Sequence, residues 1–83
     1  MRAIRKYDVE KREMIDCYVS REWRLALWNT NMDEIVNCAQ CGVKLKYGDC
    51  YTSRELMNGA GLGYGVCCKC YQEERLRAER CAS

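Results

Sequence analysis

The chain has 83 residues, which is enough for one small domain and too few for a multidomain enzyme. It contains eight cysteines but no histidine, so a Cys₂His₂ zinc finger and every catalytic site that depends on histidine are excluded. The formal net charge of +2 is too small to indicate nucleic-acid binding.

Residues 1–37 predict an N-terminal helical segment. Asp8 is a suitable N-cap with an acidic residue in the turn that follows. Five apolar residues fall on one face at helical spacing: Ile15, Tyr18, Val19, Trp23 and Ala26. Residues 23–27 also alternate as a strand would. Asn31 and Glu34 have the spacing of a capping box and predict a short helical turn.

Two Cys-x₂-Cys pairs predict a metal site. They are Cys38 with Cys41 and Cys67 with Cys70, and 25 residues separate them. Two such pairs can surround one ion, and an all-sulfur set of four ligands selects zinc, so we expect one Zn²⁺ per chain. Gly42 stands where the first pair needs a residue that tolerates positive φ. The alternative is a redox or disulfide role for these cysteines.

The region after Asn37 predicts a knuckle, a hairpin and a helix. Residues 38–48 form the knuckle, 49–56 and 62–66 read as paired strands around a loop at 57–61, and 70–81 read as a helix. The glycine-rich run at 59–65 lacks the spacing of a phosphate-binding loop and predicts a flexible hairpin instead. We therefore expect one α+β domain over residues 1–83, in which an N-terminal helix packs on a zinc module at 38–83.

The other cysteines form no second Cys-x₂-Cys pair. They are Cys17, Cys50, Cys68 and Cys81, which belong to four different predicted elements. We expect plain thiols, although a second Cys₄ site remains an open alternative.

The knuckle, hairpin and helix follow one another in the treble-clef order. The pattern Cys38-x₂-Cys41-Gly42-x₂-Leu45-x₂-Gly48-Asp49-x-Tyr51, with Cys67-x₂-Cys70 and a charged helix behind it, resembles small treble-clef zinc proteins of bacteriophages and prophages. The resemblance implies that the four paired cysteines are ligands and that Leu45 and Tyr51 are packing residues. The DksA/TraR zinc-finger regulators are a looser match, because their gap between the two pairs is shorter.

Function follows less directly from the sequence than fold does. Four thiolate ligands leave zinc no open position for water, so we expect no enzymatic activity. We expect a module that binds a protein partner in the cytoplasm, where thiols stay reduced, with Trp28 as its best contact residue. No apolar run is long enough to cross a membrane. The resemblance implies a phage accessory protein with a host or viral partner. The alternative is a nucleic-acid-binding zinc finger or transcription regulator that uses Lys44, Lys46, Tyr47, Arg54 and Tyr64.

Overall fold

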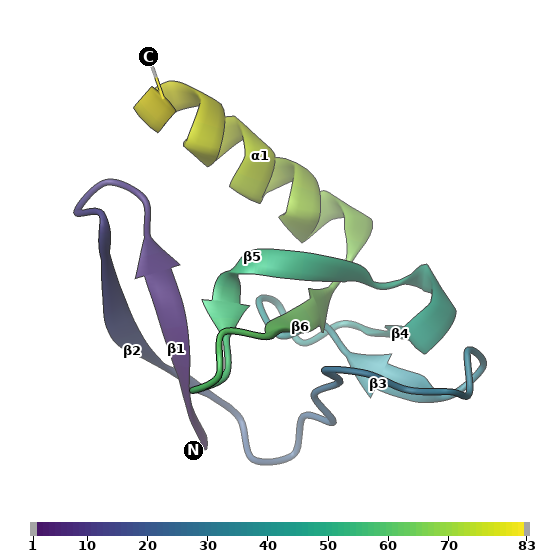
Figure 1. The fold of residues 1–83 in the computed structure, drawn as a ribbon. Coiled ribbons are helices and arrows are strands. Elements are labelled where there is room, and N and C mark those ends of the chain that lie inside the picture. Colours follow the sequence, from purple (N-terminus) through teal and green to yellow (C-terminus); the bar gives the residue numbers. More distant parts are fainter. Residues whose placement is uncertain (1, 83) are drawn as a thin grey trace.

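The computed structural model describes residues 2–82, which form two β-sheets and one C-terminal helix (Figure 1). In chain order the elements are β1 Arg2–Asp8, β2 Glu13–Val19, β3 Ile35–Asn37, β4 Lys44–Lys46, the 3₁₀ turn η1 Tyr47–Asp49, β5 Tyr51–Met57, β6 Gly63–Val66 and α1 Cys68–Ala82. The α+β class predicted from the sequence is confirmed. Among these residues, no helix is both long and apolar enough to cross a membrane.

The N-terminal region is a β-hairpin, so the predicted N-terminal helix is wrong. Strands β1 and β2 pair antiparallel from Arg2 opposite Val19 to Asp8 opposite Glu13. Ile15 and Val19 lie four residues apart, a spacing that suits one face of a strand as well as one face of a helix. Exposure alternates along β2, where Ile15, Cys17 and Val19 are the less exposed residues, and this alternation is that of a strand.

Both predicted helix caps are turn residues. The Asp8 side chain accepts hydrogen bonds from the backbone N–H groups of Glu10 and Lys11, at 3.0 and 3.2 Å, within the turn that joins β1 to β2. The Asn31 side chain accepts the N–H of Asp33 at 3.0 Å, and this turn leads into β3 without forming a helix. Short polar side chains satisfy backbone donors in turns just as they do at helix starts, which explains the error.

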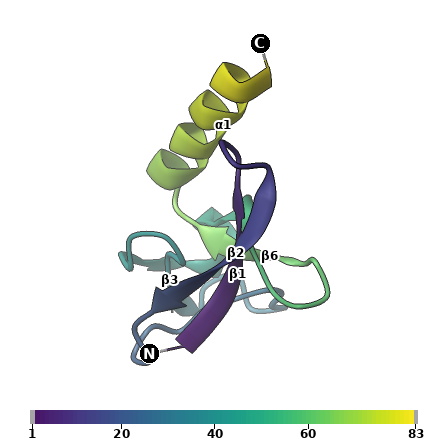
Figure 2. The same ribbon diagram turned by 90° about the vertical axis from the view of Figure 1, so that its left-hand side faces the viewer.

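The predicted hairpin and C-terminal helix are confirmed, with boundaries shifted by one or two residues. Strands β5 and β6 pair antiparallel, and β5 also pairs with β1, which gives a four-stranded sheet in the order β2-β1-β5-β6. Strands β3 and β4 form a separate two-stranded sheet. Figure 2 shows α1 rising from the sheet beside the turn of the N-terminal hairpin.

One hydrophobic cluster connects the N-terminal hairpin to the cysteine-bearing region. It joins Ile4 and Val19 of the hairpin to Leu56 and Val66 of β5 and β6, and it includes the buried Cys38, Ala39 and Cys70. Cys38 and Cys70 are thus part of the core. In a chain this short, which buries only about 60% of its unfolded surface, such a shared core matters for stability.

Candidate metal site

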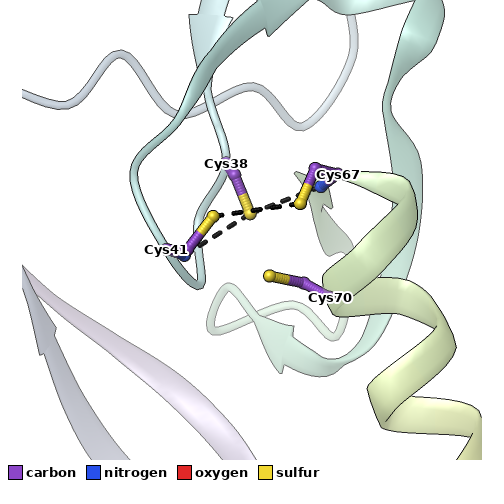
Figure 3. A group of neighbouring side chains, drawn as sticks. All are labelled: Cys38, Cys41, Cys67 and Cys70. Carbon is purple, nitrogen blue, oxygen red and sulfur yellow. Dashed lines mark hydrogen bonds between the residues drawn. The ribbon is translucent and has the colours of Figure 1, made fainter.

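Four cysteine side chains from two distant segments converge on one point (Figure 3). The Sγ atoms of Cys38, Cys41, Cys67 and Cys70 all lie within 4.8 Å of one another. The Sγ atoms of Cys41 and Cys67 are 3.8 Å apart. The structure therefore brings together the four residues that the two Cys-x₂-Cys pairs single out as ligands.

The first pair lies in the tight loop between β3 and β4. The N–H of Gly42 donates to the carbonyl of Cys38 at 2.8 Å, and the N–H of Cys38 donates to the carbonyl of Val43 at 2.9 Å. Gly42 has a φ of +82°, as its position after the first pair predicts. This loop directs both sulfurs toward the start of α1.

The second pair is placed by the N-terminus of α1. Cys67 precedes the helix and its carbonyl accepts the N–H of Tyr71 at 3.0 Å, while Cys70 lies in the first turn. The Cys38 sulfur accepts backbone N–H groups from Cys41 at 3.5 Å and from Cys67 at 3.3 Å. These donors, together with the positive end of the helix dipole, favour negatively charged sulfur.

The thiols differ in how readily they lose a proton. Burial raises the pKa of Cys38, but the N–H groups of Cys41, Cys67 and Gln40 outweigh that effect and lower the pKa from 9.0 to about 7. Burial raises the pKa of Cys41 and of Cys70, and the other sulfurs around Cys70 raise its pKa further. Cys38 therefore ionises before Cys41 and Cys70, and a cation is needed to hold all four cysteines as thiolates.

The donor set and its spacing fit a tetrahedral metal ion. Zinc–sulfur bonds of about 2.3 Å in a tetrahedron require sulfurs about 3.8 Å apart, close to the separation of Cys41 and Cys67. Four thiolates suit zinc and exclude hard cations such as Mg²⁺ and Ca²⁺, which take oxygen ligands. The arrangement can hold one ion in a closed coordination shell.

Two residues that the sequence analysis did not assign to the site support the first knuckle. The Asn37 side chain accepts the N–H of Arg24 at 2.8 Å and donates to the carbonyl of Gly42 at 2.9 Å. The ring of Trp23 lies directly over Gly42, where a Cβ atom would come within 2.3 Å of it. Local sequence carries no signal for the Asn37–Arg24 and Trp23–Gly42 contacts, because these partners are 13 and 19 residues apart.

Among the described side chains, Cys17, Cys50 and Cys68 do not gather into a second site. Within the described part of the chain, the four paired cysteines are the only cluster of three or more metal-ligating side chains that are close enough to share an ion. Cys17 packs half-buried against the core, Cys50 donates to the carbonyl of Lys46 at 3.7 Å, and Cys68 accepts a hydrogen bond from the exposed Gln72 at 3.4 Å. The side chain of Cys81 lies outside the described residues.

The predicted contact residues are distributed over several surfaces. The Trp28 side chain is 77% exposed. Lys44 and Lys46 are exposed on β4, where the Nζ of Lys46 lies 4.0 Å from a carboxylate oxygen of Asp33. Tyr64 is half-buried against the core. Tyr47 is half-buried and Arg54 is exposed on β5.

Of the two residues implied as packing residues, one packs in the core. Leu45 is half-buried against the core cluster. Tyr51 is 45% exposed and stacks on Tyr71 of α1, with ring centroids 5.0 Å apart.

Comparison of the chain with protein-family models, curated proteins and solved structures gave no match.

Proposed function

We propose that Cys38, Cys41, Cys67 and Cys70 bind one Zn²⁺ per chain and that this ion stabilises a non-enzymatic interaction module. The convergence of the four sulfurs within 4.8 Å carries the proposal. Four thiolates complete a tetrahedral shell and leave no position for a catalytic water. Zinc binding at such sites contributes about 10–16 kcal/mol in zinc-finger peptides, which is as large as the whole stability of a small domain.

Cobalt substitution tests the coordination. The reduced chain titrated with Co²⁺ is expected to develop the intense visible bands of a tetrahedral thiolate complex and to saturate at one ion, because the site offers four sulfurs. Cys41→Ser should weaken these bands, whereas Cys17→Ser should leave them unchanged, because Cys17 is not among the cysteines whose sulfurs converge. The weak bands of an octahedral ion would contradict the proposal.

An exposed apolar surface supports the interaction role. We define the Trp28 surface as Leu27, Trp28 and Met32, of which Trp28 is 77% and Met32 is 56% exposed. Leu27 and Met32 line one shallow depression together with Tyr51. Tryptophan is the residue type most often found at the energetic centre of protein interfaces, and an exposed apolar patch commonly marks such an interface.

The proposed partner is another protein with an apolar pocket that accepts the Trp28 ring. The resemblance to phage treble-clef proteins suggests an accessory protein that acts on a host or viral protein in the bacterial cytoplasm. Nucleic acid is the weaker partner class, because Tyr64 packs against the core and Tyr51 stacks on Tyr71, which leaves these rings less free to stack on bases.

A matched pair of variants tests this role. Capture from bacterial lysate by the immobilised zinc-loaded chain is expected to recover a specific protein, to persist at high salt and to be lost in Trp28→Ser. Tyr18→Ser is the control, because Tyr18 is also an exposed aromatic residue but lies on β2. Capture that survives Trp28→Ser contradicts the proposal. Retention of nucleic acid that falls steeply with salt would favour the nucleic-acid alternative instead.

A further inference from the structure

A cavity separates the N-terminal hairpin from the C-terminal helix. It has a volume of about 380 Å³ and lies between the hairpin turn, β5 and α1. Figure 1 shows α1 above β5, and Figure 2 shows α1 beside the hairpin turn. Tyr7 and Val9 from the hairpin and Tyr71 and Ala78 from the helix contribute apolar wall. The volume falls in the range of small-molecule sites, about 300–1,000 Å³. The four clustered cysteines do not line it.

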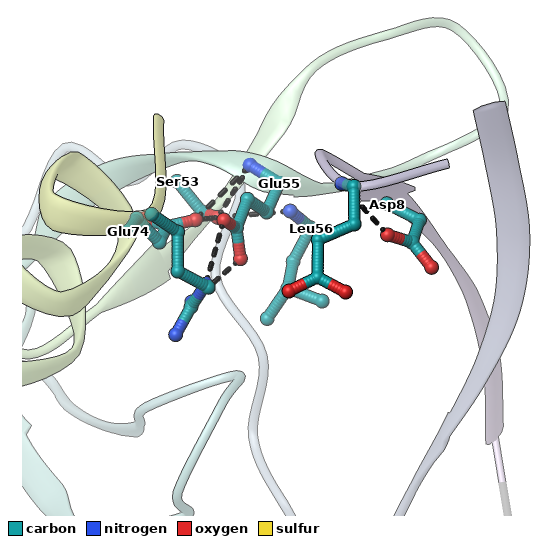
Figure 4. A network of polar contacts seen from close by, with 7 residues as sticks. Asp8, Ser53, Glu55, Leu56 and Glu74 are labelled. Atoms are coloured by element: carbon teal, nitrogen blue, oxygen red, sulfur yellow. Dashed lines mark hydrogen bonds and ion pairs between the residues drawn. The ribbon is translucent and has the colours of Figure 1, made fainter. Parts of the chain in front are cut away.

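Glu74 of α1 lines this cavity and is only 5% exposed. Its Oε1 atom accepts hydrogen bonds from the Ser53 hydroxyl and, at 3.0 Å, from the N–H of Glu55 (Figure 4). Its Oε2 atom is buried and has no hydrogen-bond partner among residues 2–82. A buried acceptor without a donor is costly and rare. Because almost none of Oε2 is accessible, a donor in the cavity reaches it by displacing the side-chain atoms that cover it.

Arg77, three residues beyond Glu74 on the same helix, is already paired with another carboxylate. Arg77 donates to both carboxylate oxygens of Glu55, with Nε at 3.0 Å and Nη2 at 2.6 Å. Its guanidinium is therefore the counterion of Glu55, whose carboxylate is almost completely buried. The unpaired acceptor of Glu74 is left as the unsatisfied polar atom of this network.

Two further arginines give the cavity an anion-binding element. Arg54 of β5 and Arg75 of α1 both line it and are exposed. Neither guanidinium group makes an ion pair or a hydrogen bond with a described residue. Two guanidinium groups from neighbouring elements are well suited to a carboxylate, which they can bind through several parallel N–H donors.

We propose that this cavity is a binding site for a small aromatic acid that carries a hydroxyl or amino donor. The donor supplies the hydrogen bond that Glu74 Oε2 lacks, the ring lies against Tyr7 and Tyr71, and the carboxylate pairs with Arg54 and Arg75. The site is separate from the metal cluster and does not depend on the proposed function.

Three related probes test the proposal on the zinc-loaded full chain by NMR titration of backbone amides. 4-Hydroxyphenylacetate has both polar ends, phenylacetate lacks the donor, and 4-methylphenol lacks the carboxylate. The first is expected to bind saturably and to shift amides around residues 7–12, 54–55 and 71–78. Phenylacetate should bind about tenfold more weakly, since one hydrogen bond to a charged group contributes at least about 1.4 kcal/mol. 4-Methylphenol should also bind more weakly.

Glu74→Gln separates the hydrogen bond from general affinity. Its amide oxygen is expected to stay toward the Ser53 hydroxyl and the Glu55 N–H, so that the NH₂ group takes the place of Oε2 and cannot accept a donor. The preference for 4-hydroxyphenylacetate over phenylacetate should then disappear. Glu73→Gln removes the same charge from an exposed position one residue away and should leave the preference intact.

A cavity-filling variant tests the cavity itself. Ala78→Phe places a ring at the cavity wall one helical turn beyond Glu74, and it should abolish binding of all three probes. The proposal is overturned if 4-hydroxyphenylacetate fails to saturate, if it binds no more tightly than phenylacetate, or if Ala78→Phe binds it as the wild type does.

Discussion

At the scale of single residues, Gly42 is a position where the chain tolerates little change. Its φ of +82° is unfavourable for any residue with a side chain, and an added Cβ would lie 2.3 Å from the Trp23 ring. Gly42→Ala is expected to lower the free energy of unfolding of the zinc-loaded protein by more than about 2 kcal/mol, since backbone strain and a steric clash add. Urea unfolding followed by Trp fluorescence measures the loss.

Two other glycines separate these two causes. Gly61 has a φ of +85° but no atom within 4 Å of its added Cβ, so Gly61→Ala should cost only the backbone strain of about 1 kcal/mol. Gly59 has neither a positive φ nor a neighbour, so Gly59→Ala should be nearly neutral. Equal losses at Gly42 and Gly61 would show that the Trp23 contact does not constrain the knuckle.

The buried Glu74 makes the free energy of unfolding fall as pH rises. Burial raises its pKa above the ordinary 4.5, although hydrogen bonds from Ser53 and Glu55 oppose the rise. A raised folded pKa means that the stability conferred by the protonated acid is complete below pH 4.5 and is lost as pH rises through the folded pKa. Glu74→Gln, which stays neutral, should therefore gain stability relative to the wild type as pH rises across this window.

The check is the difference in unfolding free energy between the variant and the wild type, measured on zinc-loaded protein at several pH values. Because both proteins carry the same four cysteines, the pH dependence of metal binding cancels in the difference. Glu73→Gln is the control that removes a charge from the same turn of α1. A difference that stays constant or shrinks with rising pH contradicts the burial of Glu74.

At the scale of elements, the ion pair between Arg77 and Glu55 joins α1 to β5. Arg77→Met leaves the nearly buried carboxylate of Glu55 without a counterion, so we expect a loss of about 3 kcal/mol in unfolding free energy. Arg75→Met changes the same charge on an exposed side chain and should stay within about 0.5 kcal/mol of the wild type. Thermal unfolding of both variants checks this. Equal losses of unfolding free energy in the two variants would show that the Arg77–Glu55 ion pair contributes nothing specific.

The elements also show where sequence reasoning succeeded and where it could not. The β5–β6 hairpin and α1 have local signals, namely alternating residues around a glycine loop and acidic-then-basic charge along the helix. The N-terminal hairpin lacks such signals. Ile15 and Val19 fit both periods, and Asp8 satisfies turn donors as it would satisfy helix donors. Only pairing with β1 and packing against the core decide between them.

The candidate metal site divides in the same way. Its four cysteines and Gly42 follow from local spacing, because a knuckle is built from consecutive residues. The Trp23 ring and the Asn37 side chain, which hold the knuckle from outside, depend on the tertiary fold.

At the scale of the whole molecule, the metal site and the N-terminal hairpin share one core. Ile4 and Val19 belong to the same buried cluster as Cys38 and Cys70. Removal of zinc by a chelator is therefore expected to unfold β1 and β2 as well as the knuckle. Without the metal, Cys38 and Cys70 are no longer held in place in the cluster that Ile4 and Val19 share. Hydrogen exchange of the amides of β1 and β2 checks this, and full protection of both strands after chelation would show that the hairpin is stabilised independently.

Metal binding also changes the charge of the molecule. Four thiolates and one Zn²⁺ carry two net negative charges, which cancel the formal +2 of the sequence. With one Zn²⁺ bound to four thiolates, the chain would carry no net charge and so would have no net attraction for the phosphates of nucleic acid.

Native mass spectrometry of the reduced chain after zinc loading tests the central claim most directly. The account predicts a single dominant species with one zinc ion per chain, because the described residues bring only Cys38, Cys41, Cys67 and Cys70 within ligand distance of one another. A chain that carries no zinc, or one that carries two ions, would contradict it.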